Sequence, residues 1–167
     1  RSASTRETTQ ELAATPTLFG EDRQPTGRYL GIPKTSSERR QFIPIAFLGP
    51  ETIASTELFT IEDADLVVFG IVCSTMHMAW VRSVCGRLKS DYRYSAGIVF
   101  NNYPWPTPTD MQRKAIEQAA QAVLDARDEY PESTLADFYD PLTMPPELTK
   151  AHKALDKAVD AAYGKTK

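Results

Sequence analysis

The sequence predicts an α+β fold, in which a small mixed β-sheet with a packed helix precedes a C-terminal α-helical hairpin. Short apolar runs bounded by glycine, proline and polar residues occupy the first two thirds of the chain, which is typical of strands. Two long alanine-rich segments with helical spacing of apolar residues occupy the rest. A chain of 167 residues with 41% hydrophobic content is long enough to bury such a core.

Five runs are predicted to be strands. Residues 66–72 are apolar throughout, as expected of a central strand that is buried on both faces. Pro44 lies inside the run 41–48 and predicts an edge strand or a bulged strand there. The other predicted strands cover residues 28–32, 58–61 and 94–100.

One helix is predicted between the strands at 66–72 and 94–100. Ser74 is a suitable N-cap, the helix continues to about Cys85, and Gly86 is placed to stop it. His77 lies on the mostly apolar helix, where a hydrogen-bonded core histidine is expected rather than a metal ligand. The residues expected to face the core are Met76, Trp80, Val81 and Val84.

The C-terminal part is predicted to form two packed helices, over residues 110–129 and 147–163. The three prolines at 104, 106 and 108 exclude a helix or a central strand over residues 101–108, because proline fixes φ and lacks an N–H, so this segment is expected to be a stiff connector. Small residues along both helices permit close antiparallel packing. The predicted stripes are Met111, Ala115, Ala119, Ala122, Val123 and Ala126 on the first helix, and Leu148, Ala151, Leu155, Ala158, Val159 and Ala162 on the second.

These features predict three parts in the chain. Residues 1–24 are polar and are expected to be a flexible lead-in or linker, residues 25–108 a recognition domain, and residues 109–167 the helical hairpin. The chain starts at Arg1 without a methionine, so we expect it to be a piece of a longer protein.

The charge of the chain is distributed unevenly. The net charge is only -3, which excludes a globally basic nucleic-acid coat. Residues 82–93 nevertheless hold four cations against one anion, whereas from Asp110 onward eleven acidic residues face eight basic ones. A local basic turn on a nearly neutral body is consistent with docking to a DNA groove from one face.

The run from Cys85 to Ser95 carries the main functional signal, because it combines both signs of charge with hydroxyls and phenols. Lysine and arginine can donate to guanine or phosphate, aspartate can accept from cytosine N4, and tyrosine can stack or bond a phosphate. The run therefore predicts sequence-specific recognition of double-stranded DNA. The candidate base-reading residues are Lys89, Asp91 and Arg93; the candidate phosphate or sugar contacts are Arg82, Arg87, Ser90, Tyr92, Tyr94, Ser95, Arg39 and Arg40; Glu57 is a weaker candidate for a second base contact.

No catalytic, cofactor-binding or metal-binding motif stands out, so the chain by itself is expected not to be an enzyme. Cys73 and Cys85 are expected to be buried free thiols, because they form no CxxC and only two histidines are present. The chain has no signal peptide and no long apolar run, which favours the bacterial cytoplasm and argues against a membrane partner.

Several long motifs resemble the target recognition region of type IIL restriction–modification enzymes, the MmeI-like family. They are the runs Phe69–Ile71, Met76–Arg82, Gly86–Ser95, Asn101–Pro106 and Leu135–Leu148, with shorter matches to Leu155 and Asp156. The resemblance covers most of the chain from about Arg28. It implies the C-terminal recognition part of a polypeptide that also carries an endonuclease and an adenine-N6 methyltransferase. S-adenosylmethionine and Mg²⁺ would serve those other parts, so no cofactor is expected in this chain.

The resemblance also implies which side chains choose the base. In that family base choice is set by side chains two apart, at the positions of Lys89 and Asp91 here, with Arg93 at the next alternate position. A lysine and an aspartate at this spacing can address one G·C pair, the lysine donating to guanine and the aspartate accepting from cytosine. Members with the opposite charge order read the opposite orientation, so this chain is expected to require G on the methylated strand.

Two other interpretations remain open. The mixed charges at residues 89, 91 and 93 could form an ordinary exposed, salt-bridged turn, and Arg82 could equally pair with a nearby acid. The second interpretation is a protein-interaction module, in which the helical hairpin docks onto other parts of a larger enzyme and no base is read. Neutralising the basic residues would distinguish these functions, since it should abolish DNA binding and leave docking intact.

Overall fold

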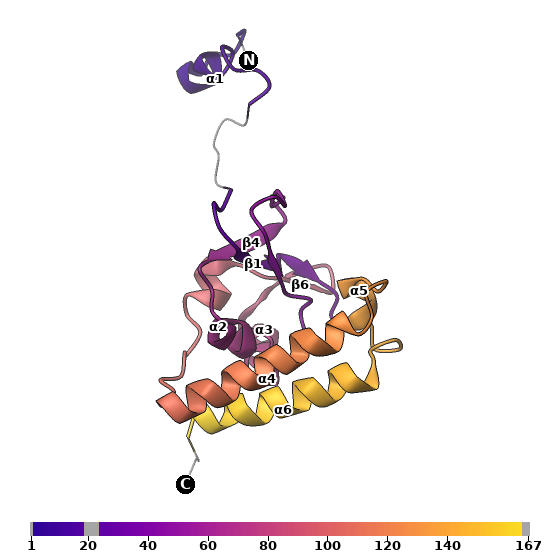
Figure 1. Cartoon of the computed structure of the whole chain (residues 1–167). Helices are drawn as coiled ribbons and strands as arrows, with labels where there is room; N and C mark the ends of the chain where they lie inside the picture. Colours follow the sequence, from indigo (N-terminus) through magenta and orange to yellow (C-terminus); the bar gives the residue numbers. More distant parts are fainter. Residues whose placement is uncertain (1, 19–23, 165–167) are drawn as a thin grey trace.

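A computed structural model of the chain describes residues 2–18 and 24–164 (Figure 1). The class α+β is confirmed, with two three-stranded antiparallel sheets where one small mixed sheet was predicted. The elements are, in order, α1 (Glu7–Glu11), β1 (Tyr29–Pro33), β2 (Thr35–Ser36), β3 (Ala46–Leu48), β4 (Leu58–Glu62), α2 (Leu66–Val72), α3 (Thr75–Val84), β5 (Gly86–Leu88), β6 (Asp91–Arg93), the π-helix η1 (Ala96–Phe100), α4 (Asp110–Asp128), α5 (Leu135–Phe138) and α6 (Pro146–Ala162).

The first sheet has the strand order β3-β1-β4, with β1 in the centre. Leu30 of β1 pairs with Phe47 of β3 and with Ile61 of β4, which sets the register on both sides. Residues 29–32 of β1 are buried, as expected of a central strand. Only the end of the predicted strand 41–48 joins the sheet. Its earlier residues Phe42, Ile43 and Ile45 are buried in the core without strand pairing.

The second sheet has the order β2-β6-β5 and is built around a tight hairpin. β5 and β6 pair through Gly86 with Arg93, Arg87 with Tyr92, and Leu88 with Asp91. β2 adds to the other edge of β6 through the pairing of Thr35 with Arg93. The β5–β6 hairpin contains all of the run that the sequence marked as functional, apart from Cys85 and the last two residues.

The run 66–72, predicted to be a central strand, is instead the buried helix α2. Asp65 caps it by accepting a hydrogen bond from the backbone N–H of Val68 at 2.8 Å. A short continuous apolar run is compatible with a buried strand or a buried helix, and the N-cap decides between them here. Gly70 in this helix faces α4 and α6 closely: a Cβ there would lie 2.9 Å from Cγ2 of Ile116 and 3.1 Å from Cδ1 of Leu155.

The predicted strand 94–100 is also replaced by a helical turn, η1. The hydroxyl of Ser95 accepts from the N–H of Ile98 at 3.3 Å and so caps this turn. The helix predicted before the hairpin is confirmed as α3, with Ser74 as its N-cap. His77 is fully buried and bonded to Tyr94, as predicted of a core histidine.

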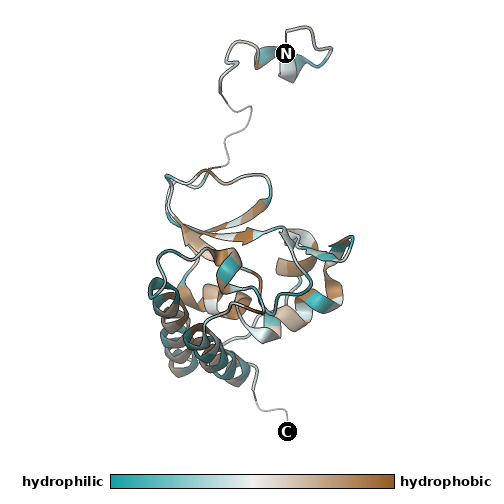
Figure 2. Ribbon diagram, turned by 90° about the vertical axis from the view of Figure 1, so that its right-hand side faces the viewer, coloured by the Kyte–Doolittle hydropathy of each residue, from teal (hydrophilic) through white to brown (hydrophobic). Residues whose placement is uncertain are grey.

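The two C-terminal helices α4 and α6 lie side by side beneath α2 and α3, while the sheets lie on the opposite side (Figure 1). Thr109 and Gln112 form a capping box that starts α4. The stripe on α6 is confirmed at Leu148, Ala151, Leu155 and Val159, and that on α4 at Val123 and Ala126, but the earlier part of the α4 stripe was placed about one position off. Met111 is 80% exposed, and the buried positions are Ile116, Ala120, Val123, Ala126 and Arg127. The outward sides of both helices are hydrophilic (Figure 2).

A buried arginine joins the helical hairpin to the rest of the fold. Arg127 of α4 donates from Nη1 to the backbone carbonyl of Ile45 at 2.9 Å and from Nη2 to the hydroxyl of Tyr139. The same hydroxyl lies 2.8 Å from Nε2 of His152 on α6. Burial, together with the nearby guanidinium, lowers the pKa of His152 to about 3. His152 is therefore neutral in this buried contact, where Arg127 links the helical hairpin to the loop before β3.

Candidate nucleic-acid interface

The β5–β6 hairpin turns through only two residues, Lys89 and Ser90. Lys89 has a φ of 56°, in the left-handed region that lysine seldom occupies. Glycine is the usual residue at a turn position of this kind. The turn is stabilised by Arg87, which donates from Nη1 to the carbonyl of Ser90 at 2.9 Å. A long cationic side chain is thus presented at the tip of the hairpin, at some cost in backbone strain.

The register divides the hairpin residues between two faces, because directly opposite residues of an antiparallel pair share a face. Arg87 and Tyr92 share one face, where the guanidinium carbon of Arg87 lies 4.1 Å from the centre of the Tyr92 ring. Leu88, Asp91 and Arg93 share the other face. This second face, which we call the open face, also receives Thr35 of β2, the partner of Arg93.

Lys89 and Asp91 have no side-chain partner within the described ranges 2–18 and 24–164. Lys89 is exposed and Asp91 is half-buried. An ordinary salt-bridged turn would join these two residues to each other or to neighbours, and the structure does not show this. The two groups therefore retain their full capacity to donate and accept hydrogen bonds.

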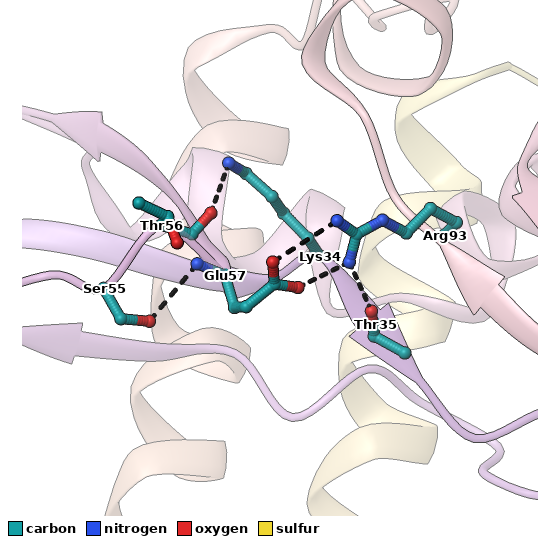
Figure 3. A network of polar contacts seen from close by, with 6 residues as sticks. All are labelled: Lys34, Thr35, Ser55, Thr56, Glu57 and Arg93. Carbon is teal, nitrogen blue, oxygen red and sulfur yellow. Dashed lines mark hydrogen bonds and ion pairs between the residues drawn. The ribbon is translucent and has the colours of Figure 1, made fainter. Parts of the chain in front are cut away.

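Arg93 is held in a polar network that joins the two sheets (Figure 3). Its Nη1 donates to Oε2 of Glu57 at 2.5 Å and to the hydroxyl of Thr35 at 2.6 Å. The hydrogen bond from Arg93 lowers the pKa of the Glu57 carboxyl, and the same bond raises the pKa of the guanidinium. Lys34 lies beside this pair and donates to the carbonyl of Thr56 at 2.6 Å. Glu57, the weaker candidate for a base contact, is therefore bonded to Arg93, one of the main base-reading candidates.

Both tyrosines near the turn, which were candidate phosphate or sugar contacts, pack inward. Tyr92 is 4% exposed beneath Arg87, and Tyr94, two residues further along the chain, is 2% exposed. The Tyr94 hydroxyl lies 3.1 Å from Nε2 of His77, and burial raises its pKa. Residues two apart on a strand lie on the same face, which is consistent with the burial of both rings. Tyr94 is therefore a packing residue here rather than a phosphate contact.

The two serines that were candidate phosphate contacts, Ser90 and Ser95, have different roles in the fold. The Ser95 hydroxyl is already used as the cap of η1. Ser90 is exposed at the hairpin tip, and its carbonyl accepts the hydrogen bond from Arg87. Ser90 thus remains accessible to a ligand, whereas Ser95 has a structural role.

Three of the candidate phosphate contacts, Arg39, Arg40 and Arg82, lie together. They line a cavity of about 410 Å³ between the loop that precedes β3, helix α3 and the segment after α5. Within the part of the chain that the structure describes, Arg82 makes one long contact, 3.5 Å from Nη2 to the carbonyl of Gln41. Glu38 in the same lining lies 4.0 Å from Nη1 of Arg87, which connects this basic cavity to the hairpin. Three guanidinium groups around one hollow can bind an anion such as a phosphate.

The described residues include no group of three or more histidine, cysteine or acidic side chains that could hold a metal ion. Cys73 is buried and free, and burial raises the pKa of its thiol to about 12, whereas the free Cys85 is only half-buried.

No single helix among the described residues is long and apolar enough to cross a membrane. Helices α2 and α3 pass that test only together, across a 55° bend.

Sequence and structure both match known proteins over the whole chain. Residues 1–107 match the family described as MmeI, target recognition domain, and residues 108–167 match the family described as MmeI, C-terminal domain. DNA methyltransferase A of Bacillus subtilis (strain 168) is 44% identical over 163 residues, which are 98% of this chain and 18% of that protein. A solved structure of the type IIL restriction–modification enzyme MmeI in complex with DNA matches with a TM-score of 0.92 and 51% identity, over 100% of this chain and 22% of that one. The chain thus spans about a fifth of the length of these relatives.

Proposed function

This chain belongs to the MmeI family, as a target recognition domain with its C-terminal domain, and we propose that it reads a short sequence of double-stranded DNA through the β5–β6 hairpin. The related structure was solved in complex with DNA, which supports this choice of partner. A two-stranded ribbon of this kind fits the major groove, where each base pair presents its own pattern of donors and acceptors.

The observation that carries the proposal is the pair of free charges at the hairpin tip. Lys89 donates and Asp91 accepts, and neither has a protein partner in the described part of the chain. In the proposed complex Lys89 donates to O6 and N7 of a guanine, and Asp91 accepts from N4 of the paired cytosine. This assignment requires G on the strand that is methylated. Reversing the two charges reverses the orientation of the G·C pair.

Arg93 is proposed to read a further base, with Glu57 as the weaker candidate for a second contact. A guanidinium has five N–H donors, and the bonds to Glu57 and Thr35 leave some of them free. Arg93 can therefore keep its place on the open face while it donates to a base edge. The ion pair holds the side chain in one orientation before DNA arrives, which reduces the entropy that binding must remove.

Phosphate contacts are proposed for the basic cavity. Arg39, Arg40 and Arg82 would bind the DNA backbone beside the groove, with Arg87 and the exposed Ser90 nearer to the tip. These contacts supply affinity and register but no base preference. They would also make binding strongly dependent on salt.

The longer protein to which such a chain belongs is proposed to be an adenine-N6 DNA methyltransferase with an endonuclease. Recognition by this chain would place the target adenine at the methyltransferase part of the same polypeptide in the bacterial cytoplasm. S-adenosylmethionine and Mg²⁺ would supply the methyl group and the cleavage chemistry there.

Selection from randomised duplexes tests the proposal. The purified chain is mixed with randomised double-stranded DNA at low salt, and the retained molecules are sequenced. We expect one enriched motif with an invariant G·C pair. No retention at all would contradict the proposal and favour the helical hairpin as a docking module.

A matched pair of variants then tests the phosphate-binding arginines. Replacing Arg39, Arg40 and Arg82 together by glutamine should reduce the slope of log affinity against log salt by about 0.9 for each phosphate that is no longer neutralised. The control replaces Lys150, Lys153 and Lys157, three lysines of α6, by glutamine. Equal effects of the two triple variants would show that only net charge matters.

A further inference from the structure

Leu88 is an exposed apolar residue in the middle of the charged hairpin. Its side chain is 54% exposed, and it is absent from the core cluster and from the partly buried residues that pack on that cluster. A single exposed leucine is common on protein surfaces and by itself indicates nothing. Its position relative to the base-reading candidates is what distinguishes it.

The register places Leu88 on the open face, directly opposite Asp91. Arg93 lies two residues further along the same face, and Lys89 follows Leu88 at the turn. The position on that face beyond Leu88 is Gly86, which has no side chain to cover the leucine. Leu88 therefore points in the same direction as the groups proposed to enter the groove. Any surface that binds Asp91 and Arg93 also meets the leucine.

The opposite face of the hairpin prevents Leu88 from turning inward. Tyr92 fills that face, Arg87 lies over its ring at 4.1 Å, and the same arginine is bonded to the turn at Ser90. A shift of register by one residue would move the leucine inward, but it would expose Tyr92. The apolar side chain is thus held in solvent until a partner covers it.

The major groove contains one apolar group, the methyl at C5 of thymine. Directly opposite residues of an antiparallel pair have Cβ atoms about 4.5–5.5 Å apart, which is comparable with the spacing of about 3.4 Å between neighbouring bases along a DNA strand. Leu88, which lies opposite Asp91 on the open face, can therefore meet the base pair next to the one that Asp91 contacts. We propose that Leu88 contacts the C5 methyl of a pyrimidine in the base pair next to the one that Lys89 and Asp91 read. It would favour thymine over cytosine there.

This inference rests on the proposed function and adds a base preference at a second position. Burying one methyl group contributes about 0.8 kcal/mol, which corresponds to roughly a fourfold change in affinity. A cytosine that carries a 5-methyl group has the same apolar contact, so it should recover that part of the affinity. A uracil, which is thymine without the methyl, should lose it.

The test uses duplexes that carry the motif selected by the wild-type chain. Each thymine beside the invariant G·C pair is replaced in turn by uracil, cytosine or 5-methylcytosine, and affinities are measured by fluorescence anisotropy. We expect uracil to weaken wild-type binding about fourfold at one position, and 5-methylcytosine to bind about fourfold better than cytosine. For Leu88→Ala both differences should disappear.

Leu142→Ala is the matched control, because Leu142 is 86% exposed and lies in the link before α6, far in the chain from the β5–β6 hairpin. It should retain the full response to the methyl group. An unchanged melting temperature of Leu88→Ala would show that the loss does not arise from unfolding.

Three results would overturn the inference. They are a selected motif without a thymine beside the G·C pair, equal wild-type affinity for thymine and uracil, and a loss in Leu88→Ala that is the same for both bases. In each case the G·C requirement of Lys89 and Asp91 would stand. Failure of the proposed function is recognised differently, by the absence of any enriched motif.

Discussion

Arg93 on β6 and Glu57 just before β4 form an ion pair, with 2.5 Å between Nη1 and Oε2, that ties the second sheet to the first. The two residues lie 36 positions apart in the chain. The link positions the hairpin on the body of the fold, and it depends on the ionised carboxylate of Glu57.

Glu57→Gln is expected to lower the melting temperature slightly at pH 7. Arg93 depresses the pKa of the Glu57 carboxyl in the folded chain, so this stabilisation is present above the unfolded pKa near 4.3 and is lost as pH falls through the folded value. Thermal melts at pH 7 and at about pH 3 test this. The difference between wild type and variant should shrink at the lower pH, and a constant difference would contradict the ion-pair account.

Gly70→Ala is expected to destabilise the fold by about 1–3 kcal/mol. The added Cβ would lie 2.9 Å from Ile116 and 3.1 Å from Leu155, so helices α4 and α6 would have to move. Urea unfolding measures the change. Gly97→Ala is the control, because a Cβ at Gly97 meets nothing within 4 Å. Equal midpoints for the two variants would show that α2 does not pack closely on the helical hairpin.

Arg127→Leu is expected to cost about 2–4 kcal/mol, because it leaves the Ile45 carbonyl and the Tyr139 hydroxyl without their donor. Tyr139→Phe removes the hydroxyl alone and should cost less. The two residues interact directly, so the double variant should be less destabilised than the sum of the single ones. Additive losses in urea unfolding would contradict a direct contact.

Acid is expected to destabilise the chain because two histidines are buried in the neutral form. Burial lowers the pKa of His77 to about 4 and that of His152 to about 3. The unfolded chain takes up these protons below about pH 6.5 while the folded chain does not, so stability falls as pH decreases from 6.5 toward 4. The shift of His77 corresponds to about 3 kcal/mol. His77→Phe should flatten the dependence of unfolding free energy on pH, and an unchanged slope would show that His77 is not the group responsible.

Lys89→Gly is expected to retain or slightly increase stability, by up to about 1 kcal/mol, because glycine accommodates the φ of 56° without strain. The same variant should lose the requirement for the G·C pair. Melting temperature and duplex selection measure the two effects separately. A marked fall in melting temperature would show that the lysine side chain stabilises the fold.

The sequence predicted best those elements that carry a strong local signal. The cap at Ser74 predicted α3, and the helical spacing of apolar residues predicted α4 and α6, each to within about a turn. The apolar run 66–72 has no periodicity, and the prediction of a strand there did not take account of the N-cap at Asp65. The stripe on α4 was shifted because alanines occur on several sides of that helix.

In the candidate site, too, the sequence identified residues within one short run but not the contacts between distant segments. Lys89 and Asp91 were selected from the mixed charges of their turn and from what the family resemblance implies, and both side chains lack partners among the described residues. The pairing of Arg93 with Glu57 and the gathering of Arg39, Arg40 and Arg82 join segments far apart in the chain. No local pattern reports such contacts. Leu88 was not among the predicted site residues, because the prediction for this turn considered only its charged, hydroxyl and phenol side chains.

The most direct test of the account is to exchange the charges at the hairpin tip. The double variant Lys89→Glu with Asp91→Arg is subjected to the same duplex selection as the wild-type chain. We expect the wild type to select G at the invariant position and the variant to select C there, with the rest of the motif unchanged. Selection of the same base by both proteins would show that Lys89 and Asp91 do not read that base pair.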